Sequence, residues 1–241
     1  MKKRTWLLAA AAVAAVAGML TAPARADIII LTPSFTLQQV MDMPGGLVVF
    51  DKTFSNFTYR STSQGGALAP TAEGISVIGF KVTFSDRTEY GLVFQGSWSA
   101  DGNKSADSFI TFKVEANAPF LISDNTLWMV GSGRNGGMAS VTELATRTNP
   151  PESDGDVLAN KFVFSNDSNQ HLVDHMTYPD AYKIVYVSKD IQVNGGTSQT
   201  GSAAISVVYQ TFSQVPEPAT MALLALGGGV ILFRRRRGRR S

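Results

Sequence analysis

Residues 108–115 read Ser-Phe-Ile-Thr-Phe-Lys-Val-Glu, and they decide the fold class of the body of this chain. Every second residue is apolar, namely Ile110, Phe112 and Val114, and the residues between them are polar. Successive side chains of a β-strand point to opposite faces, so this alternation is typical of a half-buried antiparallel strand.

The same pattern extends outward along the chain. Residues 74–84 alternate in the same way, with Ile78, Phe80 and Val82 on one predicted buried face. We expect further strands at 47–50, 54–59, 90–94, 127–130, 161–164, 182–193 and 203–212. Asn194-Gly195 predicts a hairpin between the last two strands, and only 37–41 favours a short helical turn. The sequence therefore predicts an all-β body, an antiparallel two-sheet β-sandwich.

Composition limits the function classes. The chain has 241 residues and no cysteine, which excludes disulfides, a thiol nucleophile and Cys-based metal sites. Residues 27–215 carry 11 basic and 18 acidic side chains, so the overall positive charge comes from the two ends. We therefore expect no nucleic acid as a partner of the body.

The N-terminus, residues 1–26, reads as a signal peptide with a signal helix. A basic start at 2–4 precedes an apolar stretch at 6–20, and Ala24 and Ala26 supply small residues for cleavage by signal peptidase. An uncleaved anchor is the other interpretation, but the apolar stretch is shorter than the roughly 20 residues that span a bilayer.

The C-terminus, residues 215–241, has three parts in order. A proline-rich motif at 215–220 precedes an apolar segment at 219–233, which predicts a transmembrane helix, and an arginine-rich cytoplasmic tail at 234–241. The prolines predict that the segment around Glu217 stays extended and joins neither helix nor sheet. The motif residues are Val215, Pro216, Glu217 and Pro218, and the membrane stop is Arg234, Arg235, Arg236 and Arg237.

This end resembles the PEP-CTERM sorting signal of Gram-negative bacteria. The resemblance implies an exosortase that recognises the tail and cleaves near Pro-Glu-Pro, and a link to exopolysaccharide and biofilm. Segments 51–59, 189–191 and 210–214 also resemble, more loosely, parts of other PEP-CTERM proteins, and supply no catalytic residues. The implied location is transient anchoring in the inner membrane, followed by the cell surface or extracellular matrix.

Few residues of the body suggest chemistry. His171 and His175 have a spacing that binds zinc on a helix, but Pro179 and the neighbouring polar residues favour a loop. Trp98 and Tyr178 are candidate sugar platforms, and a packed edge-strand aromatic is the other interpretation. Two oxygen-rich groups are candidate Ca²⁺ ligands or solvated turns: Asp101, Asn103, Ser105 and Asp107, and Glu152, Asp154 and Asp156.

The prediction is a signal peptide (1–26), an exported sandwich (27–214) and a sorting signal (215–241). The favoured function is a non-enzymatic envelope or matrix protein without catalytic residues, metal or cofactor. A secreted polysaccharide-active enzyme, which needs two carboxylates about 5–10 Å apart in a cleft, stays open, as does a membrane-anchored sugar- or calcium-binding module.

Overall fold

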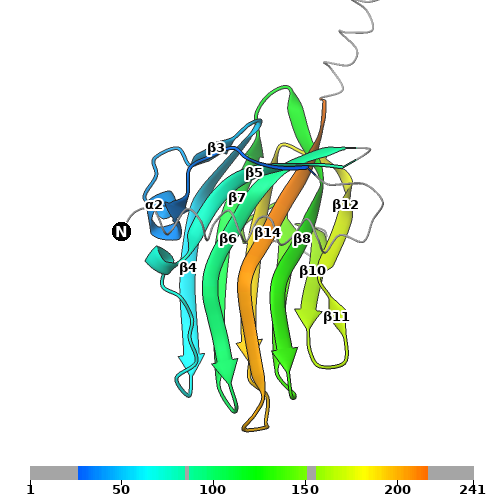
Figure 1. The fold of residues 1–241 in the computed structure, drawn as a ribbon. Helices are drawn as coiled ribbons and strands as arrows, with labels where there is room; N and C mark the ends of the chain where they lie inside the picture. Colours follow the sequence, from blue (N-terminus) through cyan, green and yellow to red (C-terminus); the bar gives the residue numbers. More distant parts are fainter. Residues whose placement is uncertain (1–26, 85–86, 151–155, 217–241) are drawn as a thin grey trace, which may run out of the picture.

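A computed structural model describes residues 27–84, 87–150 and 156–216. They form two antiparallel sheets of seven strands each, packed face to face as a sandwich (Figure 1). The predicted signal helix and transmembrane helix lie outside the described residues. Within the described ranges, no helix has both the length and the apolar character that crossing a membrane requires.

The first sheet has the strand order β1-β5-β6-β14-β8-β12, with β2 paired to β5. Its longest strands, β6, β8 and β14, run side by side (Figure 1). The strand bounds are β1 Asp27–Ile30, β2 Phe35–Thr36, β5 Ser76–Thr83, β6 Thr88–Asp101, β8 Phe120–Arg134, β12 Val173–Tyr182 and β14 Ser202–Pro216.

The second sheet has the strand order β11-β10-β9-β13-β7-β4-β3. The segment from which the fold was predicted lies in β7, at an inner position of this sheet, where Ile110, Phe112 and Val114 are buried. The bounds are β3 Leu47–Val49, β4 Lys52–Gln64, β7 Ser105–Ala116, β9 Met138–Thr146, β10 Val157–Ser165, β11 Gln170–His171 and β13 Ile184–Asn194.

One short helix, α2 (Leu37–Met41), and a 3-10 turn, η1 (Ala72–Gly74), complete the described elements. The helix matches the predicted helical turn. The helix begins after Thr36. The Thr36 hydroxyl accepts a hydrogen bond from the Gln39 backbone N–H, and the Gln39 side-chain oxygen accepts one from the Thr36 backbone N–H. This reciprocal pair satisfies two donors that a helix start otherwise leaves open.

The main core lies between the two sheets. At its centre the Phe54 ring packs 6.2 Å from Phe112 and 6.0 Å from Phe212, so aromatic side chains of both sheets meet. All three rings are almost fully buried. These contacts bury large apolar surfaces and hold the layers together.

A second apolar cluster lies on the other face of the first sheet. On β5, Val77 belongs to the main core, whereas Ile78, Phe80 and Val82 belong to this second cluster. Trp128 joins it. The alternation of β5 was predicted correctly, but its buried apolar face does not point between the sheets. Neighbouring residues of a strand face opposite sides, and periodicity alone does not say which side is inner.

The predicted hairpin at Asn194-Gly195 is wrong. β13 pairs with β7 and β9, whereas β14 pairs with β6 and β8 in the other sheet. The connection therefore crosses from one sheet to the other. At this end of the sandwich, a side chain on Gly195 would collide with the backbone of Gly102, and one on Gly196 with that of Gly136. The glycines serve close packing between loops rather than a two-residue turn.

Candidate functional site

The predicted sorting motif begins inside the last strand of the sandwich. β14 continues through Val215 and Pro216, which pair with Leu121 and Phe120 of β8. The prediction that this segment joins no sheet is therefore wrong for Pro216. A proline at the end of a strand is tolerated, since its missing N–H interrupts no further ladder bond.

A buried lysine fixes this end of β14. Lys52 Nζ donates to Gln214 Oε1 at 2.8 Å and lies 2.9 Å from Asp51 Oδ1. Burial lowers the pKa of Lys52, while the charges of Asp51, Asp124 and Glu89 act in the opposite direction. The lysine joins the start of β4 in one sheet to the end of β14 in the other.

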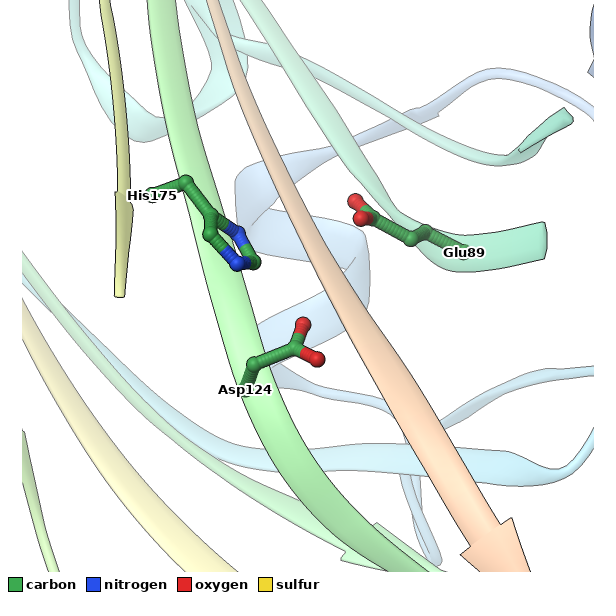
Figure 2. A group of neighbouring side chains, drawn as sticks. All are labelled: Glu89, Asp124 and His175. Carbon is green, nitrogen blue, oxygen red and sulfur yellow. The ribbon is translucent and has the colours of Figure 1, made fainter. Parts of the chain in front are cut away.

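Three polar side chains gather nearby on the first sheet. Glu89 of β6, Asp124 of β8 and His175 of β12 bring ligand atoms within 4.8 Å of one another. They point toward one another across β14 (Figure 2). Glu89 is fully buried, Asp124 is nearly so, and His175 is exposed. We call these three residues the acid–histidine cluster.

The acid–histidine cluster is held by neighbouring donors. Glu89 accepts from Thr211 Oγ1 at 2.5 Å and from Arg87 Nε at 2.5 Å. His175 Nδ1 lies 2.9 Å from Thr126 Oγ1. Two carboxylates and one imidazole suit a small cation or the hydroxyls of a polar ligand. Arg87 already neutralises part of the carboxylate charge, as does the electrostatic effect of Lys52.

The zinc pair that this spacing would allow on a helix does not form. His171 lies on β11 of one sheet and His175 on β12 of the other, so the spacing of four residues has no helix to act on. In the part of the chain that the structure describes, the group that could hold a metal contains His175 without His171. Sequence reasoning missed Glu89 and Asp124, because the pairing of β6, β14, β8 and β12 brings them together.

The first predicted calcium group is divided between elements. Asp101 ends β6 and Ser105 begins β7, and these strands belong to different sheets. Asp107 instead shares a hydrogen bond with Asp190 of β13, beside a polar surface hollow of about 400 Å³. Burial and the Asp107 charge raise the pKa of Asp190 to about 6, partly offset by Arg60.

The structure describes only one residue of the second candidate calcium group, Asp156. Glu152 and Asp154 are outside the described residues. Asp156 pairs with Arg147, with Oδ1 2.9 Å from Nη2. Also outside the described residues are Ala24, Ala26, Glu217, Pro218 and the arginines 234–237.

Of the two interpretations of Trp98 and Tyr178, the sugar platform is wrong and the packed aromatic is confirmed. Trp98 is 1% exposed, and its Nε1 donates to Ser108 Oγ at 2.9 Å between the sheets. Tyr178 is 5% exposed. Both rings are therefore part of the packed interior rather than faces on which a sugar could stack. The polar neighbours of Trp98 suggested exposure, but they occupy the opposite face of the same strand.

Comparisons with known proteins place the C-terminal segment in a known class. Residues 214–237 match the PEP-CTERM protein-sorting motif. No curated protein matches the chain.

Solved structures give weaker likenesses. A module named TmCBM61, solved with β-1,4-galactotriose, is 12% identical, with 63% of this chain and 86% of that chain covered, at a TM-score of 0.29. A structure of carbohydrate-binding modules from the β-sandwich superfamily is 14% identical (71% and 58% covered, TM-score 0.27). A family two carbohydrate esterase from Cellvibrio japonicus is 12% identical (67% and 36% covered, TM-score 0.25).

Because these TM-scores are low, we infer neither fold nor function from the similarities. The matched region also spans only about a third of the esterase. The sorting motif is specific, and it begins at the end of β14 where the structure places Gln214 to Pro216. The chain therefore carries a PEP-CTERM protein-sorting motif, which marks it as an exported protein of the class that exosortases process.

Proposed function

We propose that this chain is a non-enzymatic protein of the cell envelope or extracellular matrix that associates with exopolysaccharide. Signal peptidase would cleave it after Ala26, the C-terminal helix would hold it briefly in the inner membrane, and an exosortase would release it near Pro-Glu-Pro. The sorting motif at 214–237 is the observation that carries the proposal.

The position of the motif supports processing without loss of the fold. β14 ends at Pro216, so a cut at 216–218 falls directly after the last residue that pairs with β8. The Lys52–Gln214 bond lies before the cut. The body would therefore leave the membrane with both sheets complete.

One pair of described acids is arranged in a way that does not suit glycoside hydrolysis. Asp107 lines a polar surface hollow and shares a hydrogen bond with Asp190. A glycosidase needs its two carboxyl groups about 5–10 Å apart, so that substrate and water fit between them. Two carboxyl groups that share a hydrogen bond leave no such space between them.

The experiment is the mass of the terminal peptides of the protein from native cells, separated into membrane, medium and polysaccharide fractions. The wild type should begin at Asp27 and end near Pro216–Pro218 outside the inner membrane. Glu217→Ala should keep the C-terminal tail and stay in the membrane. Glu73→Ala, which removes one exposed carboxylate from η1, is the matched control and should be processed normally.

Retention of residues 221–240 by the wild type would refute exosortase release. A released protein recovered entirely in the medium, with none bound to polysaccharide, would refute the association with polysaccharide. Any added mass on the new C-terminus would identify the group to which it is joined.

A cation-binding module is the second candidate function, and the acid–histidine cluster is the observation that favours it. Zn²⁺ added to the purified full chain should then raise its melting temperature, since a ligand that binds only the folded state stabilises it. His175→Ala should remove the effect, and His171→Ala, the matched control, should keep it. An equal response of both variants would reject a site at the cluster.

A further inference from the structure

Three charged side chains are enclosed between the sheets. Glu143 of β9 lies opposite Lys161 of β10 and opposite Lys189 of β13 in the strand register. All three side chains have 0% exposure. Glu143 Oε1 lies 2.9 Å from Lys161 Nζ, and Glu143 Oε2 pairs with Lys189 Nζ.

An amide from the opposite sheet completes this group. Asn125 of β8 reaches across the core, and its Nδ2 donates to Glu143 Oε1 at 2.6 Å. Lys161 Nζ donates to Asn125 Oδ1. One carboxylate oxygen therefore contacts both the lysine nitrogen and the amide nitrogen. The Lys161 nitrogen also contacts the side-chain carbonyl oxygen of Asn125, which is bonded to the carbon that the lysine would attack.

The group holds more positive than negative charge. Among the described residues, Glu143 is the carboxylate that pairs with both lysines. Burial would raise the pKa of Glu143, but Lys161 and Lys189 outweigh burial and lower it. Burial lowers the pKa of Lys189, and the Lys161 charge adds to this effect. An uncompensated charge closed off from water is strongly unfavourable.

We propose that Lys161 and Asn125 join spontaneously in an intramolecular amide bond, with Glu143 as the catalytic acid and base. Glu143 accepts a proton from the Lys161 ammonium, and the neutral amine attacks Asn125 Cγ. Glu143 then protonates Nδ2 and accepts the second proton of the attacking nitrogen. The Cγ–Nδ2 bond breaks, and ammonia leaves with the remaining proton as ammonium.

The reaction balances without a further reactant. A lysine ammonium and a primary amide become a secondary amide and an ammonium ion, and the Glu143 carboxylate is regenerated. No oxidant, water or cofactor is consumed. The product removes the Lys161 charge, so Glu143 and Lys189 remain as one neutral pair in the closed core.

The second lysine lacks this arrangement. Lys189 Nζ donates to Gln210 Oε1 at 2.7 Å, but Gln210 Nε2 donates to the Thr126 backbone oxygen at 3.3 Å. A backbone carbonyl cannot protonate a departing nitrogen. The chemistry therefore selects Asn125 and Lys161, which a bond would join across the two sheets, from β8 to β10. A chain without cysteine has no disulfide that could make such a link.

The test is mass spectrometry of the full chain purified from cells and denatured. The intact mass should be lower than the mass of the observed sequence by one ammonia molecule. Trypsin should not cleave after Lys161, and it should release peptide 114–134 joined to peptide 148–183. A cyclic imide at Asn125 loses the same mass but leaves the two peptides separate, so the branched peptide is the decisive observation.

Variants separate the roles. Glu143→Gln should slow linkage about 100-fold or more, because it removes the acid and base. Asn125→Asp should form the same linked product by losing water. Asn160→Ala, an exposed matched control, and Gln210→Met should both remain linked. Wild-type protein with the full mass, a cyclic imide, or a link through Lys189 would each overturn the proposal, whether or not any variant folds.

Discussion

Asp190→Asn should stabilise the protein at neutral pH. Asp190 shares a hydrogen bond with Asp107 of β7, and Arg60 of β4 is the cation whose charge acts on it. Its pKa is raised from 3.8 to about 6, by burial first and by Asp107 second. A carboxyl group whose folded pKa is raised contributes stability below pH 3.8, and this contribution is lost as the pH rises through about 6.

The magnitude follows from this shift. Two pKa units correspond to about 3 kcal/mol, but the Asp190 side chain is only partly buried, so solvent screening reduces the effect to about 1 kcal/mol. The asparagine amide can donate to Asp107 at every pH and carries no charge. The variant should therefore exceed the wild type by about 1 kcal/mol at pH 7.5, which is about 3 °C in melting temperature for a domain of this size.

The assay is thermal unfolding of wild type and variant at pH 7.5 and pH 4.5, with Asp101→Asn as the matched loss of one exposed carboxylate from β6. Differences between proteins at one pH cancel the titration of the other acids. The advantage of Asp190→Asn should fall to about a third at pH 4.5, where Asp190 is protonated in the folded wild type but still mostly ionised in the unfolded chain. A lower stability of the variant at pH 7.5, or an equal advantage at both values, would refute the reasoning.

Three further substitutions should destabilise the sandwich, as measured by urea unfolding. Phe54→Ala opens a cavity where Phe112 and Phe212 meet, and should cost about 3–5 kcal/mol, whereas Val48→Ala at an exposed site of β3 should cost little. Gly91→Ala places a methyl group against the backbone of Gln210, so β6 and β14 must separate, at a cost of about 3 kcal/mol or more. Lys52→Met leaves the Asp51 carboxylate buried without its partner, and should cost about 3–5 kcal/mol. A change below about 1 kcal/mol in any of the three would contradict its mechanism.

Local secondary structure could be predicted from the sequence. Alternation located β5, β7 and β14, and a capping pattern fits the predicted turn at 37–41. Sheet membership was not readable, because the two sheets exchange strands through loops whose direction periodicity does not encode. This explains the mistaken hairpin at Asn194, and periodicity likewise left open on which side of its sheet the buried face of β5 lies. The short edge pairing of β11 and the irregular register of β12 gave no alternation to detect.

The candidate sites differ in the same way: those formed by neighbouring residues could be predicted, and those formed by strand pairing could not. The sorting motif is linear, so its residues stand next to one another in the sequence and were found. The acid–histidine cluster requires the pairing of four strands, which sequence alone did not provide. A usable signal did exist for the buried charges. Lys189 has the same parity as Ile191 and Val193 on β13, so a lysine stands where alternation requires an inward apolar residue.

Two buried lysines of this sandwich lie where the sheets are joined. Lys52 bonds to Gln214, and Lys189 bonds to Gln210, so each lysine comes from the second sheet and each amide from β14 of the first. An apolar pair would stabilise the core at least as well, since removing two charges from water is costly. A lysine and an amide add specificity, because their hydrogen bond forms only when the two strands lie in one particular position relative to each other. β14 is the strand that leads into the sorting motif. Fixing its register therefore fixes where the folded body ends and where the sorting motif begins.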